Sequence, residues 1–129
     1  VKGTTSNQKV QLNPILSGEE ILYFQELIRK IPIADNVLEY AVSLATKTRP
    51  NTTMATDEVN QYISWGAGPR ASQYLVLGAK CNAAVMGKYS PDIEDVRAVA
   101  NYVLRHRVVR NYKAEAEGIT EEDIIKNLL

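Results

Sequence analysis

Apolar residues recur along most of this chain at spacings of three and four, the pattern of a helix face turned toward a core. The first such run follows a capping box, in which the Ser17 hydroxyl accepts from the Glu20 backbone N–H and the Glu20 carboxylate reaches back. We therefore predict a first helix behind Ser17 that ends at Pro32. Its apolar positions are Ile21, Phe24, Leu27, Ile28 and Ile31.

The same spacing predicts further helices, whose ends carry residues that favour helix termini. Asp35 is the expected cap of the second helix, and Pro69 is the expected first residue of a long third helix that Gly87 ends. Asp92 and Thr120 are each followed by acidic residues, as N-caps often are, so we expect helices behind both. The third helix is rich in small residues that would let neighbours pack closely. They are Ala71, Gly78, Ala79, Ala83 and Ala84.

Other segments complete the expected fold. Residues 57–65 are predicted to form one short helix, and the β-prone residues 31–33 and 107–114 are predicted to form a minimal two-stranded pairing. Residues 1–16 are polar and irregular, so we interpret them as a linker or extended arm. The fold class is therefore all-α, or mostly α, with a compact helical bundle over residues 17–129.

Length and composition exclude several classes of protein. A chain of 129 residues suffices for one compact domain. The 15 Lys and Arg balance the 15 Asp and Glu, which argues against a general nucleic-acid or membrane-surface binder. One cysteine and one histidine exclude a disulfide framework and an all-His metal site. We see no membrane segment and no signal peptide, so we expect a cytoplasmic location, and the start at Val1 suggests a piece of a longer protein.

Zero net charge conceals an uneven distribution along the chain. Residues 97–113 hold five basic side chains and no acid, whereas residues 114–129 hold five acids against Lys126. In one interpretation these faces neutralise each other. In the other, the basic segment faces phosphates or an acidic partner surface.

The sequence contains few groups that could carry chemistry. No phosphate-binding loop and no metal-ligating motif is present. Cys81 lies in the middle of the third helix among apolar residues, so we expect a buried structural thiol. His106 lies between Arg105 and Arg107, where we expect a packed or surface histidine rather than a base.

Arg70 has an unusual position, because it falls in the first turn of the third helix. The positive pole of the helix dipole lies there, and residues 69–73 contain no acid to offset a second positive charge. One interpretation is an anion site, in which the arginine adds a planar fork to free backbone amides. The other is an arginine that reaches back to Asp57 or Glu58.

Residues 65–72, Trp-Gly-Ala-Gly-Pro-Arg-Ala-Ser, resemble the Gly-Ala-Ser/Gly-Pro-Arg-Ala motif in the lid of MoxR-type AAA+ ATPases. Upstream, Thr48-Arg49 resembles the Thr-Arg that ends an earlier helix in this family. The similarity extends over residues 17–129. Downstream it includes Leu75, Ala79-Lys80, Gly87-Lys88, Asp95-Val96-Arg97 and Val103-Leu104-Arg105-His106-Arg107.

This resemblance implies a helical lid domain and a role for Arg70. In the family, the arginine at this position is the second sensor, a catalytic residue that reaches the terminal phosphate of ATP in the core domain. Gly66, Gly68, Pro69 and Ala71 would belong with Arg70 to the cofactor-binding turn. The lid itself would hold no metal, since Mg²⁺ would be held by the core.

The resemblance also implies properties of the whole protein. It would hydrolyse ATP, form an oligomeric ring with neighbouring subunits, and act as a chaperone-like remodelling or assembly factor, often with von Willebrand A-domain partners. The lid alone is not expected to hydrolyse ATP or to bind it stably. Two alternatives stay open, namely a helical nucleic-acid-binding module that uses residues 97–113 and a pure interaction scaffold.

Overall fold

The structure is a computed structural model that describes Thr5 and residues 12–129. The expected mostly helical fold is confirmed. The elements are α2 (Gly18–Lys30), α3 (Asp35–Lys47), α4 (Asp57–Tyr62), β1 (Ile63–Trp65), α5 (Pro69–Val85), α6 (Ile93–Leu104), β2 (Val109–Arg110), α7 (Tyr112–Glu117) and α8 (Glu121–Leu128). Most of the arm expected at residues 1–16 lies outside the described residues, and residues 12–16 carry no helix or strand.

Helices α5 and α6 pack against each other at the centre of the bundle, and α3 packs against both. Their close approach depends on Gly78, because a Cβ there would lie 3.1 Å from Val99 Cγ2. The expectation that small residues of this helix admit a close neighbour is therefore confirmed. Helix α8 closes the core from the C-terminal side. The largest fully buried apolar side chains are Leu44, Leu75, Leu104, Ile124, Ile125, Val59 and Val96.

Side chains cap most of the described helices as expected. Capping boxes begin α2 at Ser17, α6 at Asp92 and α8 at Thr120. The prediction for α3 was wrong, since its N-cap is Ala34, which makes no side-chain cap, and Asp35 is the first helical residue. Its carboxylate still lies in the first turn, where it complements the helix dipole.

The two-stranded sheet exists, but its first strand differs from the one predicted. Strand β1 pairs antiparallel with β2, with Ile63 opposite Arg110 and Trp65 opposite Val109. Residues 57–65 therefore form a short helix and then a strand instead of one helix. The β-branched Ile63 ends α4 in extended conformation and buries its side chain. Residues 31–33 only link α2 to α3.

Residues 107–114 contain a shorter strand than predicted, because a helix begins within them. The Asn111 side chain accepts from the Ala114 backbone N–H and caps α7, and Gly118 ends this helix in the left-handed region at φ 72°. Both end signals are visible in the sequence.

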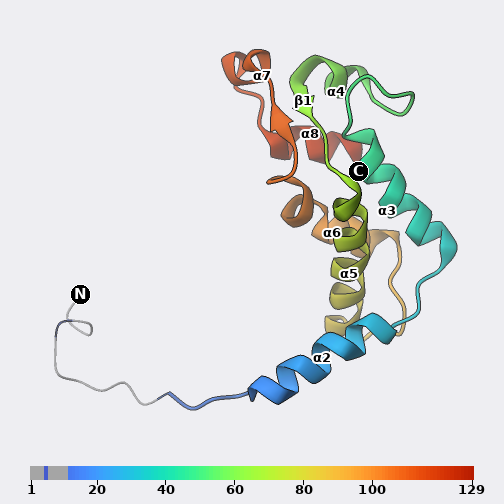
Figure 1. The fold of residues 1–129 in the computed structure, drawn as a ribbon, viewed down its shortest axis with the longest axis vertical. Helices are drawn as coiled ribbons and strands as arrows, with labels where there is room; N and C mark the ends of the chain where they lie inside the picture. Colours follow the sequence, from blue (N-terminus) through green and yellow to red (C-terminus); the bar gives the residue numbers. More distant parts are fainter. Residues whose placement is uncertain (1–4, 6–11) are drawn as a thin grey trace.

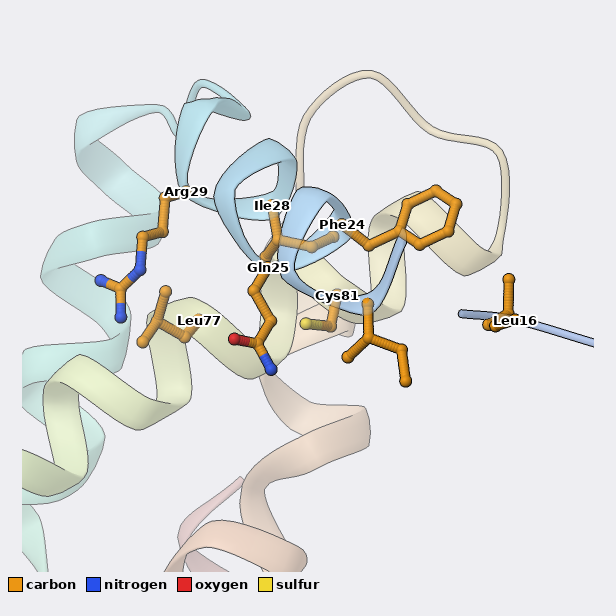
Figure 2. Close-up of a pocket in the computed structure, with 8 residues that line it drawn as sticks. Leu16, Phe24, Gln25, Ile28, Arg29, Leu77 and Cys81 are labelled. Carbon is orange, nitrogen blue, oxygen red and sulfur yellow. The ribbon is translucent and has the colours of Figure 1, made fainter. Parts of the chain in front are cut away.

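Helix α2 lies at one end of the molecule, opposite the end that holds α4, α7 and the sheet (Figure 1). It packs against α5, yet none of its residues is buried. An open groove of about 440 Å³ lies between the two helices. Figure 2 shows Leu77 and Cys81 of α5 beneath the side chains of α2. The groove is lined by Leu16, Ile21, Phe24, Gln25, Ile28, Arg29, Leu77 and Cys81.

This groove also corrects the interpretation of Cys81, whose side chain is exposed and not buried. The apolar neighbours that suggested burial lie along α5, but Cys81 is on the face of α5 that α2 covers incompletely. Within the part of the chain that the structure describes, no helix has the length and apolar character that a membrane span needs.

Candidate functional site

Arg70 occupies the second position of α5, and its side chain is exposed. Within residues 12–129 it forms no ion pair and no side-chain hydrogen bond. The interpretation that Arg70 reaches back to Asp57 or Glu58 is therefore wrong. Glu58 instead accepts from the Asn127 Nδ2 amide at 2.9 and 3.1 Å. The guanidinium is consequently free to meet a ligand or another domain.

The start of α5 differs from those of the other described helices in its electrostatics. Each of the others has a side-chain cap, an acid in its first turn, or both. Helix α5 has neither, because its N-cap is Gly68. Pro69 has no N–H, the Ala71 N–H bonds to the Gly68 carbonyl at 2.9 Å, and the Arg70 N–H has no partner among the described residues. The positive end of a 17-residue helix is thus left uncompensated.

The loop that leads into α5 is held by the end of α3. The Thr48 hydroxyl accepts from the Ala67 backbone N–H at 2.8 Å and donates to the Ala45 carbonyl at 2.7 Å. Arg49 Nε donates to the Ala67 carbonyl, also at 2.8 Å. Gly66 allows this close approach, because a Cβ there would lie 2.3 Å from the Thr48 carbonyl oxygen. Both backbone polar groups of Ala67 are therefore fixed from α3.

The five expected site residues form one continuous turn, but they face different surroundings. Gly68, Pro69 and Arg70 are exposed. Ala71 is completely buried, so its methyl group packs in the core and can only anchor the helix. Gly66 is half-buried against the end of α3. A ligand could reach the turn at its three exposed residues.

Thr48 and Arg49 were not among the expected site residues, although the structure places both against this turn. The available signal was the Thr-Arg pair at the end of the second predicted helix. Sequence reasoning matched it to the family but assigned it no contact. Its partner, Ala67, lies 19 positions beyond Thr48, and this pairing is decided by how α3 packs.

The basic segment of residues 97–113 is matched by acids within the same domain. Arg105 pairs with Glu122 at 3.3 Å and Arg110 with Glu121 at 2.8 Å, which joins the segment to α8. The remaining pairs are Arg97 with Glu94 and Lys113 with Glu117. These contacts favour the interpretation that the two charged faces neutralise each other.

Arg107 and His106 lie together near the start of α5. The Arg107 guanidinium stacks over the Tyr74 ring, 4.9 Å from its centre, and its Nη1 contacts His106 Nε2 and donates to the Val103 carbonyl. His106 is exposed, as a surface histidine would be. These contacts give Arg107 a packing role.

The Gly-Lys and Asp-Val motifs meet at a buried carboxylate. Asp95 is 1% exposed and accepts from the Asp92 backbone N–H, the Asn82 amide and the Lys88 ammonium. Burial alone would raise the pKa of Asp95, but these three donors together lower it below its usual value. Hydrogen bonds to the carboxylates of Asp92 and Asp95 raise the pKa of Lys88. Both motifs therefore join the start of α6 to α5 and its C-terminal loop.

The donors present fit an anion better than a metal ion. Arg70 and its free backbone N–H suit phosphate oxygens. Among residues 12–129, His, Cys, Asp and Glu side chains nowhere gather in a group of three that could hold a metal ion.

The fold and the turn before α5 define a class of domain that sequence comparison confirms. The family model described as AAA lid domain matches residues 55–128, and the chain belongs to this family. The chain is 32% identical over 119 residues to the chaperone MoxR1 of Mycobacterium tuberculosis (strain ATCC 25618 / H37Rv). The aligned region covers 92% of this chain and 32% of that protein. The resemblance to MoxR-type lids is thus confirmed.

Two further comparisons agree. The protein YeaC of Bacillus subtilis (strain 168) is 25% identical over 118 residues, covering 92% of this chain and 34% of that protein. A crystal structure at 2.00 Å resolution of a protein described as an ATPase from Cytophaga hutchinsonii ATCC 33406 superposes with a TM-score of 0.86. That chain is 31% identical, and the match covers 98% of this chain and 38% of the other. The chain thus spans about a third of the length of these relatives.

Proposed function

We propose that this chain is the lid of an ATP-hydrolysing AAA+ protein and that Arg70 is its second-sensor arginine. The main support is that Arg70 is an exposed cation without a partner among the described residues. It lies at the start of a helix that has neither a side-chain cap nor an acidic residue in its first turn. Such a group is mildly unfavourable where it stands. A phosphate brought to the turn from another domain would make the arrangement favourable.

The residues of the turn have separate tasks in this proposal. Arg70 presents a planar fork of N–H donors, which would stabilise negative charge developing on the terminal phosphate of ATP. The free Arg70 backbone N–H lies at the positive end of α5 and adds to the same field. Gly68 and Pro69 shape the exposed turn, while Ala71 anchors it in the core. The core domain would hold the nucleotide and Mg²⁺.

The apolar groove between α2 and α5 supports a second part of the proposal, contact with the protein's own core domain. Ile21 and Phe24, which line the groove from α2, are 47% and 46% exposed, and apolar side chains are unfavourable when a helix leaves them in water. The relatives are about three times as long as this chain, so such proteins contain a further region that can cover this face. When the nucleotide state changes, the movement of the lid would then be coupled to the core domain through both α2 and Arg70.

The remaining parts of the proposal concern the whole protein. We propose that it works in the cytoplasm as a ring and remodels or assembles client proteins, with von Willebrand A-domain proteins among its partners. Support comes from the chaperone named among the relatives and from the family.

Arg70→Ala in the full-length protein tests the central claim. We expect ATP turnover to fall by roughly 10²-fold or more, because one transition-state donor is lost, with only a modest loss of nucleotide affinity. Steady-state hydrolysis and equilibrium binding of ATP measure the two effects. Arg97→Ala is the matched control, since that arginine lies on α6 outside the turn of residues 66–71, where it pairs with Glu94 and donates to the Tyr40 hydroxyl. Unchanged turnover in Arg70→Ala would remove the proposed role.

A further inference from the structure

We infer that Thr48 and Arg49 are positioning residues for Arg70. They hold the backbone of the loop before α5 so that the Arg70 side chain leaves the domain in one fixed direction. This inference rests on the proposed function of Arg70 and adds two residues that form no hydrogen bond with Arg70 and act on it through Ala67.

Two side chains hydrogen-bond to the backbone of Ala67. Ala67 is completely buried, so its backbone N–H and carbonyl must both find protein partners. The Thr48 hydroxyl takes the N–H and Arg49 Nε takes the carbonyl, each at 2.8 Å. No strand or helix contains Ala67, and these two side chains replace the regular pairing that such an element would provide.

Ala67 and Arg70 are close together along the chain. Only Gly68 and Pro69 separate Ala67 from Arg70, and the proline ring fixes φ at one of these two positions. With Ala67 held at one end and α5 beginning at the other, little freedom remains in the turn. A change in the Ala67 position would therefore pass to the base of the Arg70 side chain.

The surroundings of Thr48 and Arg49 suit them to hold the loop in place. Thr48 is 1% exposed, and its hydroxyl donates to the Ala45 carbonyl while it accepts from Ala67, which links the last turn of α3 to the loop. Arg49 has no acidic partner among the described residues and uses its Nε–H on a neutral carbonyl. Arg49 therefore acts as a hydrogen-bond donor to one backbone carbonyl and not as one half of an exposed ion pair.

The need for such control follows from the chemistry proposed for Arg70. A donor to a reacting phosphate acts only within hydrogen-bond distance, and a misplacement of about 1 Å can lower a rate by about 10²-fold. Gly66 supports the same purpose, because its missing side chain lets the loop lie directly against the Thr48 carbonyl.

The test uses the full-length protein with Thr48→Val, which keeps the shape of the side chain and removes the hydroxyl, and Thr48→Ser, which keeps the hydroxyl. We expect Thr48→Val to lower kcat about tenfold with little change in the dissociation constant of ATP, and Thr48→Ser to stay within about twofold of the parent. Arg49→Met, which removes the donor to Ala67, is expected to act like Thr48→Val. It covers the case in which Thr48→Val fails to fold.

Double variants separate positioning from general damage. If Thr48 acts through Arg70, Thr48→Val adds little further loss in the background of Arg70→Ala. Two outcomes would overturn this inference but leave the proposed function intact. One is that the losses from Thr48→Val and Arg70→Ala are additive. The other is that Thr48→Val and Arg49→Met both show normal turnover while Arg70→Ala is impaired. Normal turnover in Arg70→Ala would instead overturn the proposed function.

A second measurement does not depend on hydrolysis. In the chain of residues 1–129, Thr48→Val should accelerate amide hydrogen exchange at Ala67 and increase the mobility of the Arg70 amide in ¹⁵N relaxation. Arg70→Ala should leave exchange at Ala67 unchanged. Equal exchange and mobility in Thr48→Val and the parent chain would show that the hydroxyl does not fix the turn.

Discussion

Helices α2 and α6 both begin with a capping box and both carry an apolar stripe, but only α6 uses this stripe in the core. Val96, Ala100 and Leu104 of α6 are completely buried, whereas no residue of α2 is. The difference lies in the neighbours. Helix α6 packs along α5 and also meets α3 and α8, while α2 meets mainly α5 and projects from the end of the bundle (Figure 1). An apolar stripe thus predicts a helix and the face with which that helix makes contacts. Whether this face is buried depends on what the rest of the protein places against it.

The largest expected effect compares one leucine from each helix. In the chain of residues 1–129, Leu104→Ala should lower the free energy of unfolding by about 3 kcal/mol, because it leaves a cavity in a closed core. Leu27→Ala should lower it by less than about 1 kcal/mol, since that side chain is already 41% exposed. Urea denaturation measures both values. Equal losses would mean that α2 is as well packed as α6.

An intermediate effect compares the carboxylates of the two capping boxes. At neutral pH, Asp95→Asn should lower the free energy of unfolding by about 2 kcal/mol, because it weakens bonds to a buried group and leaves Lys88 without its buried partner. Glu20→Gln should change the melting temperature little, since Glu20 is exposed. Thermal unfolding of both variants at one pH provides the comparison. A larger loss of thermal stability for Glu20→Gln than for Asp95→Asn would contradict this prediction.

The pH dependence of stability should follow the same carboxylate. The pKa of Asp95 is lowered in the folded chain, so its stabilisation is complete above the unfolded value of about 3.9 and is lost as the pH falls through the lower folded value. Between pH 7 and pH 3 the parent chain should therefore lose more thermal stability than Asp95→Asn does. Equal losses would assign acid sensitivity to other carboxylates, such as Glu20 and Asp123, whose pKa values are also lowered by hydrogen bonds to their capping partners.

The smallest expected effect on stability comes from alkylation of Cys81 in the groove. A bulky maleimide should label Cys81 readily in the chain of residues 1–129 and leave its melting temperature nearly unchanged, because the thiol is exposed. In the full-length protein the same thiol should be protected, if the core domain covers the face of α2 as we propose. Mass spectrometry of the peptide that contains Cys81 gives the extent of labelling.

A cysteine at the far end of the molecule controls for general reactivity. Tyr112→Cys on α7, combined with Cys81→Ser, places an exposed thiol opposite α2 (Figure 1). It should label equally in both proteins. Equal labelling of Cys81 in both proteins would mean that the groove stays open and that α2 lacks the proposed cover.

Much of the fold was predictable because its signals are local. The boxes at Ser17, Asp92 and Thr120 and the proline that starts α5 each act within four residues, and all four helix starts were confirmed. The strand pairing was not predictable in this way. Residues 31–33 and 63–65 both contain strand-favouring side chains, and the choice between them depends on which segment the fold brings beside β2.

The candidate site shows the same division. The position of Arg70 in a helix start without acids could be read from the sequence, as could the likeness of its turn to a known lid. The sequence could not show that Arg70 has no side-chain partner among residues 12–129, because Asp57 and Glu58 are close to it in sequence and only packing shows that their carboxylates do not reach it. Ala71 likewise turned out to face the core.

The sequence by itself determined where α2, α5, α6 and α8 begin, the charge balance and the motif that identifies the lid, since each depends on neighbouring residues. The tertiary structure decided which acids neutralise residues 97–113, which face of α5 leaves Cys81 exposed, and how Thr48 and Arg49 reach Ala67. These features join segments far apart in the chain. They depend on the packing of helices against one another, which no local pattern of residues specifies.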